Sequence, residues 1–230
     1  MKNDPTEAAR KAWSTQHALL RRLLEVEQDI PAARAIFLEH HAMLHSPGLQ
    51  AGASLSFQDE ALRGWSSAQL RALPGGKDNS AAWCIWHITR IEDATLNVLL
   101  ADEPQVFQEG GWQKKTKSPF VDTGNGMDPG TVAQLSSALD LDALLAYRLA
   151  VGVRTREIVK RFSRTHLDQK PDPARLERLK ADGTVRPTED WLLGYWGGHP
   201  GSNLLLMPAT RHPFVHLNEI KRLLPKLRRI

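Results

Sequence analysis

The segment from Ser80 to Leu100, SAAWCIWHITRIEDATLNVLL, is the strongest helix candidate in the chain. Helical patterns also dominate the remaining sequence, and no segment alternates convincingly between apolar and polar residues with the period of two that is typical of a strand. Further long helices are expected over residues 7–26, from Asp29 to about His45, over residues 140–162 and after Pro213. This pattern predicts an all-α bundle that forms one domain over residues 1–230.

Shorter features complete the predicted layout. Short helices are expected around residues 59–64 and 174–181 and after Thr188, and a Gly-Gly pair at 197–198 interrupts the last of these. Asp29 fits an N-cap, because a proline follows in what would be the first turn. The segment from Glu103 to Gly130 is rich in glycine, proline and polar residues, and a long connection of this kind in a compact domain is often functional.

Composition and charge describe a soluble globular protein. Hydrophobic residues make up 41% of the 230 residues and charged residues 24%, which is an ordinary balance for such a chain. The net charge of +4 arises from basic residues that collect between positions 148 and 180 and in the C-terminal KRLLPKLRRI. No aromatic and basic RNA-binding box accompanies them, so a solvated helix face is the favoured interpretation and no nucleic-acid partner is expected.

Cysteine usage and the N-terminus predict a cytoplasmic protein. Cys84 is the single cysteine and cannot form an intramolecular disulfide, which fits a reducing compartment. The N-terminal MKNDPTEAARKAW has no apolar core of a signal peptide, and the longest apolar runs, such as LLLM, are too short to cross a bilayer. We therefore expect no membrane partner.

Histidine spacing gives two candidate ligand pairs. Nine randomly placed histidines would give roughly 0.3 pairs separated by four residues, and the chain has two such pairs, His41 with His45 and His212 with His216. The first pair lies in the last turns of a predicted helix, where a protonated imidazole complements the negative helix end, and that explanation is favoured over metal binding. The second pair lies at the start of its helix, where no dipole argument favours a cation.

His87 is the best candidate for a third ligand. At 100° per residue its helix face also carries Trp83, Cys84, Ile91 and Ala94, so the imidazole is expected to point into the bundle. A single inward histidine is more often a hydrogen-bonded core residue than a ligand. An inward histidine together with an inward pair on another long helix favours a metal site, because catalytic metals commonly take three protein ligands.

These motifs resemble those of the DinB/YfiT-like superfamily of metalloenzymes. AAWCIWHITRIEDATLNVLL, in which Trp83 precedes His87 by four residues, resembles the first metal-ligand helix of that family. HPFVHLNEIKRLL resembles its second ligand motif, a His-x-x-x-His pair that opens a helix. The order and separation of the motifs also fit, with one histidine in the first half and a pair near the C-terminus.

The resemblance implies a DinB-like four-helix bundle of up-down-down-up topology, here with extra short helices and long loops over 46–79 and 103–137. It implies that His87, His212 and His216 hold a divalent metal, most often nickel or zinc, with water in the open positions. Characterised relatives include S-transferases and isomerases that use a low-molecular-weight thiol, and hydrolase-like members. The chain departs from the pattern at Asn218, where many relatives have glycine, and at Pro213, which directly follows the first histidine of the pair.

Three neutral imidazoles leave a metal its full positive charge, so a bound water could reach a pKa of about 7 or a thiol could bind as thiolate. We therefore expect a metal-dependent enzyme that acts on a small molecule, either as a thiol-dependent S-transferase or as a hydrolase. The alternative is a metal- or small-molecule-binding helical module without turnover.

Several neighbours of the proposed site have ordinary explanations that we favour. Cys84 is expected to be a small buried hydrophobe rather than a fourth ligand, and Arg90 a solvated or ion-paired residue rather than a contact for an anionic substrate. Glu92 and Asp93 are expected to point away from His87. His199 is explained by helix capping and is the leading substitute ligand for His212.

Tryptophans and leucines lead to two further expectations. Trp83, Trp191 and Trp196 are more easily explained as bundle core than as the walls of a pocket. The pocket itself is expected where Trp83, His87 and His212 converge, bordered by residues 103–137. On the first helix a broad apolar surface that one bundle would not cover, together with the resemblance, predicts a homodimer; this surface consists of Leu19, Leu20, Leu23 and Leu24.

Overall fold

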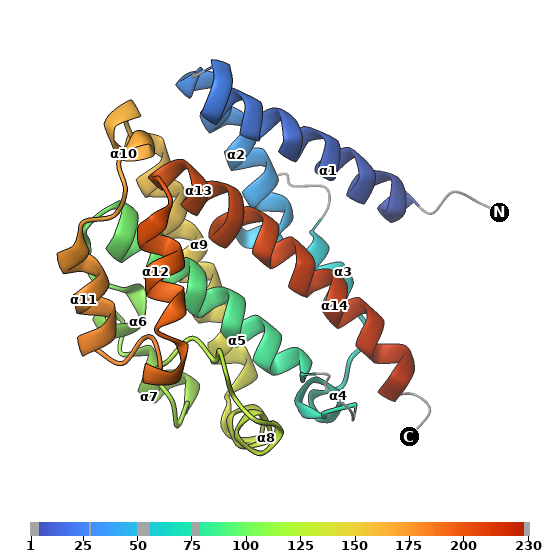
Figure 1. Cartoon of the computed structure of the whole chain (residues 1–230). Coiled ribbons are helices and arrows are strands. Elements are labelled where there is room, and N and C mark those ends of the chain that lie inside the picture. The colour runs from blue at the N-terminus through green and yellow to red at the C-terminus, as the bar shows by residue number, and fades with distance from the viewer. Residues whose placement is uncertain (1–4, 28, 50–55, 75–78, 228–230) are drawn as a thin grey trace.

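All regular structure in the described part of the chain is helical, which confirms the predicted all-α fold (Figure 1). The computed structural model describes residues 5–27, 29–49, 56–74 and 79–227. The long helices are α1 (Pro5–Arg22), α2 (Ile30–Met43), α5 (Ala81–Glu92), α9 (Leu141–Arg161) and α14 (His212–Leu227). The shorter ones are α3 (Phe57–Leu62), α4 (Ser67–Arg71), α6 (Val106–Glu109), α7 (Trp112–Thr116), α8 (Pro129–Ala138), α10 (Arg164–Asp168), α11 (Pro173–Ala181), α12 (Trp191–Gly198) and α13 (Gly201–Leu206). The up-down-down-up order of the bundle helices stays a prediction.

Side-chain caps fix the starts of three long helices. Asp29 caps α2 as predicted, since its carboxylate accepts a hydrogen bond from the backbone N–H of Ala32 at 3.0 Å. Ser80 caps α5 and Asp140 caps α9 in the same way. Each cap satisfies a backbone N–H group that has no partner within its helix, which explains why the predicted boundaries agree with the structure to within a few residues.

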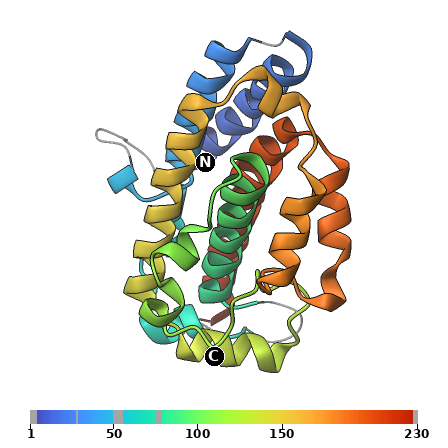
Figure 2. The same cartoon turned by 90° about the vertical axis from the view of Figure 1, so that its left-hand side faces the viewer.

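The helix predicted over Ser80–Leu100 is the central element of the molecule (Figure 2). It consists of α5 and the π-helical segment η3 (Asp93–Leu100), and every residue from Ala81 to Leu100 is buried. Helix α9 packs on one part of its surface and α14 on another, and α14 runs alongside it in the opposite direction (Figure 1). The helix contributes to both hydrophobic clusters of the core, so it joins the two parts of the interior.

Glu92 on this central helix anchors α2 and α9. Its carboxylate accepts hydrogen bonds from His41 Nε2 at 2.7 Å, His45 Nε2 at 3.2 Å and the Thr155 hydroxyl at 2.8 Å. The guanidinium of Arg148 lies 3.9 Å away. A buried carboxylate is stable only with such partners, so these contacts fix how α2 and α9 pack on α5.

Asp93 and Arg90 perform the same role on another side of the helix. The Asp93 carboxylate accepts the Tyr147 hydroxyl at 2.5 Å and the backbone N–H groups of Val106 and Phe107 at 2.9 Å each. Arg90 is 1% exposed and pairs with Asp93 at 3.5 Å. The ion-paired interpretation of Arg90 is therefore correct, and its side chain is part of the core rather than of a substrate rim.

The C-terminal helix begins earlier than the sequence indicated. Instead of starting at Pro213, the helical run continues from α13 through a π-helical segment, η5 (Met207–Arg211), into α14. The Leu206 carbonyl beside this wide turn accepts from the Thr210 hydroxyl at 2.9 Å and lies 3.0 Å from His17 Nε2. These side chains give the Leu206 carbonyl hydrogen-bond partners beside the wide turn. The helical run can therefore continue although it contains proline. His212 is thus a helical residue and not a cap.

The apolar surface expected on the first helix is not present. Leu20, Leu23 and Leu24 are buried within the single chain, and Leu19 packs half-buried against the same core. The leucines therefore give no support to the predicted homodimer, which stays a prediction. No helix within the described residues combines the length and the apolarity that crossing a bilayer requires.

Several histidines are buried in the core in neutral form. Burial lowers the pKa of His40 to about 4, helped by the neighbouring His17. Burial likewise lowers the pKa of His45 to about 3, and Arg148 adds to the effect. In the unfolded chain both groups would titrate near the ordinary value of 6.5. Between that value and the folded pKa, the unfolded state therefore binds more protons than the folded state.

Acidification is expected to destabilise the fold before the carboxylates titrate. The contribution of these neutral histidines to the free energy of unfolding should be fully present above about pH 6.5. It should fall as the pH drops toward 4, by up to ~1.4 kcal/mol per pH unit for each histidine that gains a proton only on unfolding. The measurement is urea unfolding of chelator-treated protein at pH 7, 6 and 5. The variant His40→Asn should show a shallower pH dependence, and equal stability at pH 7 and pH 5 would contradict the account.

Candidate metal centre

His87 lies on the central helix with its Nε2 atom directed at α14. Its imidazole is 4% exposed, and the Trp83 ring stacks on it with centroids 4.5 Å apart and an interplanar angle of 14°. Its Nδ1 atom lies 2.7 Å from the backbone oxygen of Thr123, so this nitrogen carries the proton and donates. The other ring nitrogen, Nε2, then presents a lone pair. Metal-ligating histidines are commonly held in this way, by a hydrogen bond from the ring nitrogen that does not bind the metal.

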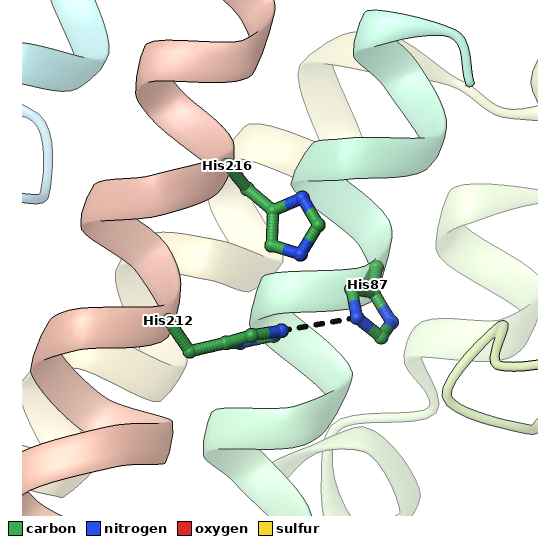
Figure 3. A group of neighbouring side chains, drawn as sticks. All are labelled: His87, His212 and His216. Carbon is green, nitrogen blue, oxygen red and sulfur yellow. Dashed lines mark hydrogen bonds between the residues drawn. The ribbon is translucent and has the colours of Figure 1, made fainter. Parts of the chain in front are cut away.

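The histidine pair of α14 faces the same point (Figure 3). Ring centroids are 4.8 Å apart for His87 and His212, 5.0 Å for His87 and His216, and 4.7 Å within the pair. One turn of α14 separates the two residues of the pair, so both project from one face of the helix. The predicted adjacency of the two helices, with His87 and His216 facing each other, is thus confirmed.

His216 is held by a carboxylate that the sequence reasoning missed. Its Nδ1 lies 2.8 Å from a carboxylate oxygen of Glu219, three residues further along α14. The i, i+3 spacing of histidine and glutamate was visible in the sequence and could have identified this partner. The contact fixes the orientation of the ring and leaves Nε2 available, as the Thr123 carbonyl does for His87.

The distances fit a shared metal. The nitrogen ligand atoms of the three histidines all lie within 4.8 Å of one another, and Nε2 of His212 is 3.0 Å from Nε2 of His87. Two nitrogens bound to one metal at about 2.0–2.1 Å are separated by roughly 2.8–3.4 Å at octahedral or tetrahedral angles. Imidazole nitrogens suit zinc, nickel, iron and copper, so the donor set fits a transition metal.

Burial and neighbouring groups keep two of the three histidines, His87 and His212, in the form that a metal requires. Burial lowers the pKa of His87 to about 3, and the nearby His216 lowers it further than the Thr123 hydrogen bond raises it. Burial, followed by the influence of the other two histidines, also holds the pKa of His212 well below its usual range. Neutral imidazole is the metal-binding form. The buried Nδ1 of His212 has no protein hydrogen-bond partner, so it is satisfied only by a small molecule such as water.

Of the other candidates from the sequence, Cys84 lies beside the three-histidine cluster and His199 lies outside it. Cys84 is buried and is grouped with His216 and Glu219, whose ligand atoms also lie within 4.8 Å of its sulfur. His199 ends α12 and packs against Tyr195 with ring centroids 4.9 Å apart. The three-histidine cluster contains His212 as first predicted, so the substitute ligand is not needed.

His41, His45 and Glu92 form a second group whose ligand atoms lie within 4.8 Å, and it has the composition to hold a metal ion. The expectation that the two histidines serve to complement the negative end of their helix is wrong, because both are fully buried and contact the Glu92 carboxylate. The histidines pair with Glu92, which lies about fifty residues further along the chain. The position of a histidine within its own helix does not reveal such a distant partner. The nearby Arg148 cation disfavours a second divalent cation there, since like charges repel strongly in the interior.

A cavity of about 350 Å³ opens beside the cluster. His87 and His212 line it, and so do Trp191 and Trp196 of α12 and Asn125 of the loop before α8. The predicted border by residues 103–137 is therefore correct, and two of the three tryptophans are pocket walls rather than only core. A larger cavity of about 570 Å³ is lined by charged residues and contains none of the three histidines.

Fold and site together define an all-helical protein with a three-histidine cluster beside a cavity. A family model described as the DinB superfamily matches residues 58–207, which is more than half of the chain. The chain therefore belongs to the DinB superfamily. The match includes His87 and ends before His212 and His216. The place of these two residues in the cluster is therefore supported by the structure and not by the family match. No curated protein matches the chain.

Replacing both His41 and His45 by alanine is expected to leave the metal content of the protein unchanged. The fold should be destabilised by roughly 3–5 kcal/mol, because Glu92 loses two partners while it remains buried. Elemental analysis of the purified variant is the measurement. If the double alanine variant does not fold, glutamine at both positions keeps hydrogen-bond donors near Glu92. A loss of metal from a folded variant would show that the second group is a metal site.

Proposed function

We propose that the protein is a metal-dependent enzyme whose divalent ion, nickel or zinc, is held by His87, His212 and His216. The observation that carries this proposal is the convergence of three histidine side chains, two of which, His87 and His212, line a cavity. Metal sites with a purely structural role are usually closed by four protein ligands, whereas catalytic sites keep a position open. Three histidines beside a cavity match the second arrangement.

A divalent ion in this place would lower the pKa of a water or a small thiol toward neutrality, which supplies a nucleophile. The residues of the chain prepare the site for that chemistry. The Thr123 carbonyl and the Glu219 carboxylate orient two of the imidazoles. Burial lowers the pKa of His87 to about 3, which keeps its imidazole neutral. We infer transfer to a low-molecular-weight thiol, or hydrolysis, as the reaction.

We also infer that the substrate is a small molecule and that the protein acts in the cytoplasm. The cavity volume of about 350 Å³ is within the range of ordinary ligand pockets. The single, buried Cys84 is compatible with a reducing compartment. The competing function is a binding module without turnover, which would share the metal site but lack an exchangeable ligand position.

Elemental analysis should find about one transition-metal equivalent per chain, and His87→Ala should lose it. The loss follows because the remaining histidines of α14 provide only two ligands, fewer than a stable site requires. His199→Ala is the matched control, since His199 lies outside the three-histidine cluster. Retention of metal by a folded His87→Ala protein would refute the assignment of this ligand.

Substitution with cobalt(II) distinguishes the enzyme from the binding module. If a ligand position is open, azide or a small thiol should change the visible absorption spectrum of the cobalt protein. The variant Trp65→Ala, which changes a half-buried tryptophan that does not line the cavity, should respond like the original protein. A spectrum that responds to neither ligand would indicate a closed site and would favour the binding module.

A further inference from the structure

The cavity beside the three-histidine cluster is aromatic and carries no formal charge. Trp196 forms part of its buried wall, and Trp191 and Tyr195, which are 60% and 37% exposed, stand at its edge. None of the described residues that line it is a lysine, arginine, aspartate or glutamate. Trp191 and Tyr195 belong to one short helix, α12, and remain exposed at the edge of the cavity. Both are therefore available for contact with a ligand.

The contrast with the other large cavity is informative. The cavity of about 570 Å³ is lined by the charged residues Lys114, Lys117 and Asp182 together with apolar side chains such as Phe107. A charged ligand placed there would find partners of either sign. In the metal-free protein, the same ligand in the cavity at the histidines would lose its hydration, and no side chain that lines this cavity would supply an opposite charge. The side chains that line the two cavities therefore suit ligands of different polarity.

Asn125 is a polar side chain of the cavity that is held in a fixed direction. Its Oδ1 accepts a hydrogen bond from the Thr123 hydroxyl at 2.8 Å, so its Nδ2–H group is left to donate. The residue stands between Gly124 and Gly126, whose φ angles of +85° and +67° favour glycine. A Cβ atom on Gly124 would lie 2.9 Å from Trp83, so the loop must approach the central helix closely.

We propose that this cavity binds an uncharged organic molecule that contains a ring and a hydrogen-bond acceptor. The ring packs between Trp191 and Trp196, and the acceptor takes the N–H of Asn125. The molecule then lies against His87 and His212, which line the same cavity. This inference rests on the proposed function, because it names the substrate class of the proposed metal site.

Burial of a ring against tryptophan is favourable beyond the area that it removes from water, and the cavity is large enough for a bicyclic molecule. A single directed donor gives orientation at little cost, since an acceptor of the ligand replaces a water molecule. The inferred specificity thus comes from two sources, apolar contact and one hydrogen bond, which can be removed independently.

The test is isothermal titration calorimetry of the full chain with four probes of one skeleton: naphthylmethanol, methylnaphthalene, naphthoate and naphthylmethylammonium. The experiment is done with the protein as purified and after treatment with a chelator, because a carboxylate can also bind a metal. The alcohol is expected to bind to both forms. In the chelated protein the carboxylate and the ammonium should bind at least about tenfold more weakly. Equal or tighter binding of either charged probe to that form would overturn the proposal.

Two variants separate the two contacts. Trp191→Ala should weaken the binding of naphthylmethanol about tenfold, whereas Trp65→Ala, which removes a tryptophan outside the cavity, should not change it. Asn125→Leu should abolish the advantage of the alcohol over methylnaphthalene. Unchanged affinity in Trp191→Ala, or an unchanged advantage in Asn125→Leu, would show that the probe does not bind as inferred.

Failure of this inference and failure of the proposed function can be told apart. Metal content decides whether the three histidines hold an ion, and probe binding to the chelated protein does not depend on that result. A protein without metal that still selects the uncharged probe would refute the proposed enzyme but support the cavity proposal. A metal-loaded protein that binds none of the probes would support the proposed metal site but refute the cavity proposal.

Discussion

The structure depends on satisfying four ionisable side chains that one buried helix carries into the core. His87, Arg90, Glu92 and Asp93 lie within two turns of α5 and its continuation, and none is more than 4% exposed. Leaving any of the charged ones unpaired in the interior would cost several kcal/mol. Each neighbouring element therefore contributes a partner, and the positions of these partners determine how the bundle is assembled around the helix.

The same pairing positions the candidate metal centre. Glu92 attaches α2 and α9 through His41, His45 and Thr155. The loop before α8 supplies the Thr123 carbonyl that orients the imidazole of His87. Helix α14 then brings its two histidines close to the Nε2 side of that ring. The site is thus built on rigid helices and one tightly held loop, which is what a metal centre of fixed geometry requires.

Local sequence signals predicted the long helices, and together with the family resemblance they named the three histidines that the structure brings together. Helix periodicity and caps gave the boundaries of α2, α5 and α9, and the face of α5 showed that His87 points inward. Partners from distant parts of the chain were not visible, because periodicity reports which face of a helix is buried but not which residue lies opposite. His41 and His45 were misinterpreted for this reason. The continuation of the helix through η5 was also missed, since proline ordinarily signals a helix start.

The most direct test of the account is anomalous diffraction from crystals of the protein as purified, measured at the absorption edge of the metal that elemental analysis finds. We predict one anomalous peak at about 2.0–2.1 Å from a nitrogen of each of His87, His212 and His216. A peak between His41, His45 and Glu92 instead, or no peak at the three-histidine cluster in a metal-containing protein, would contradict the central claim.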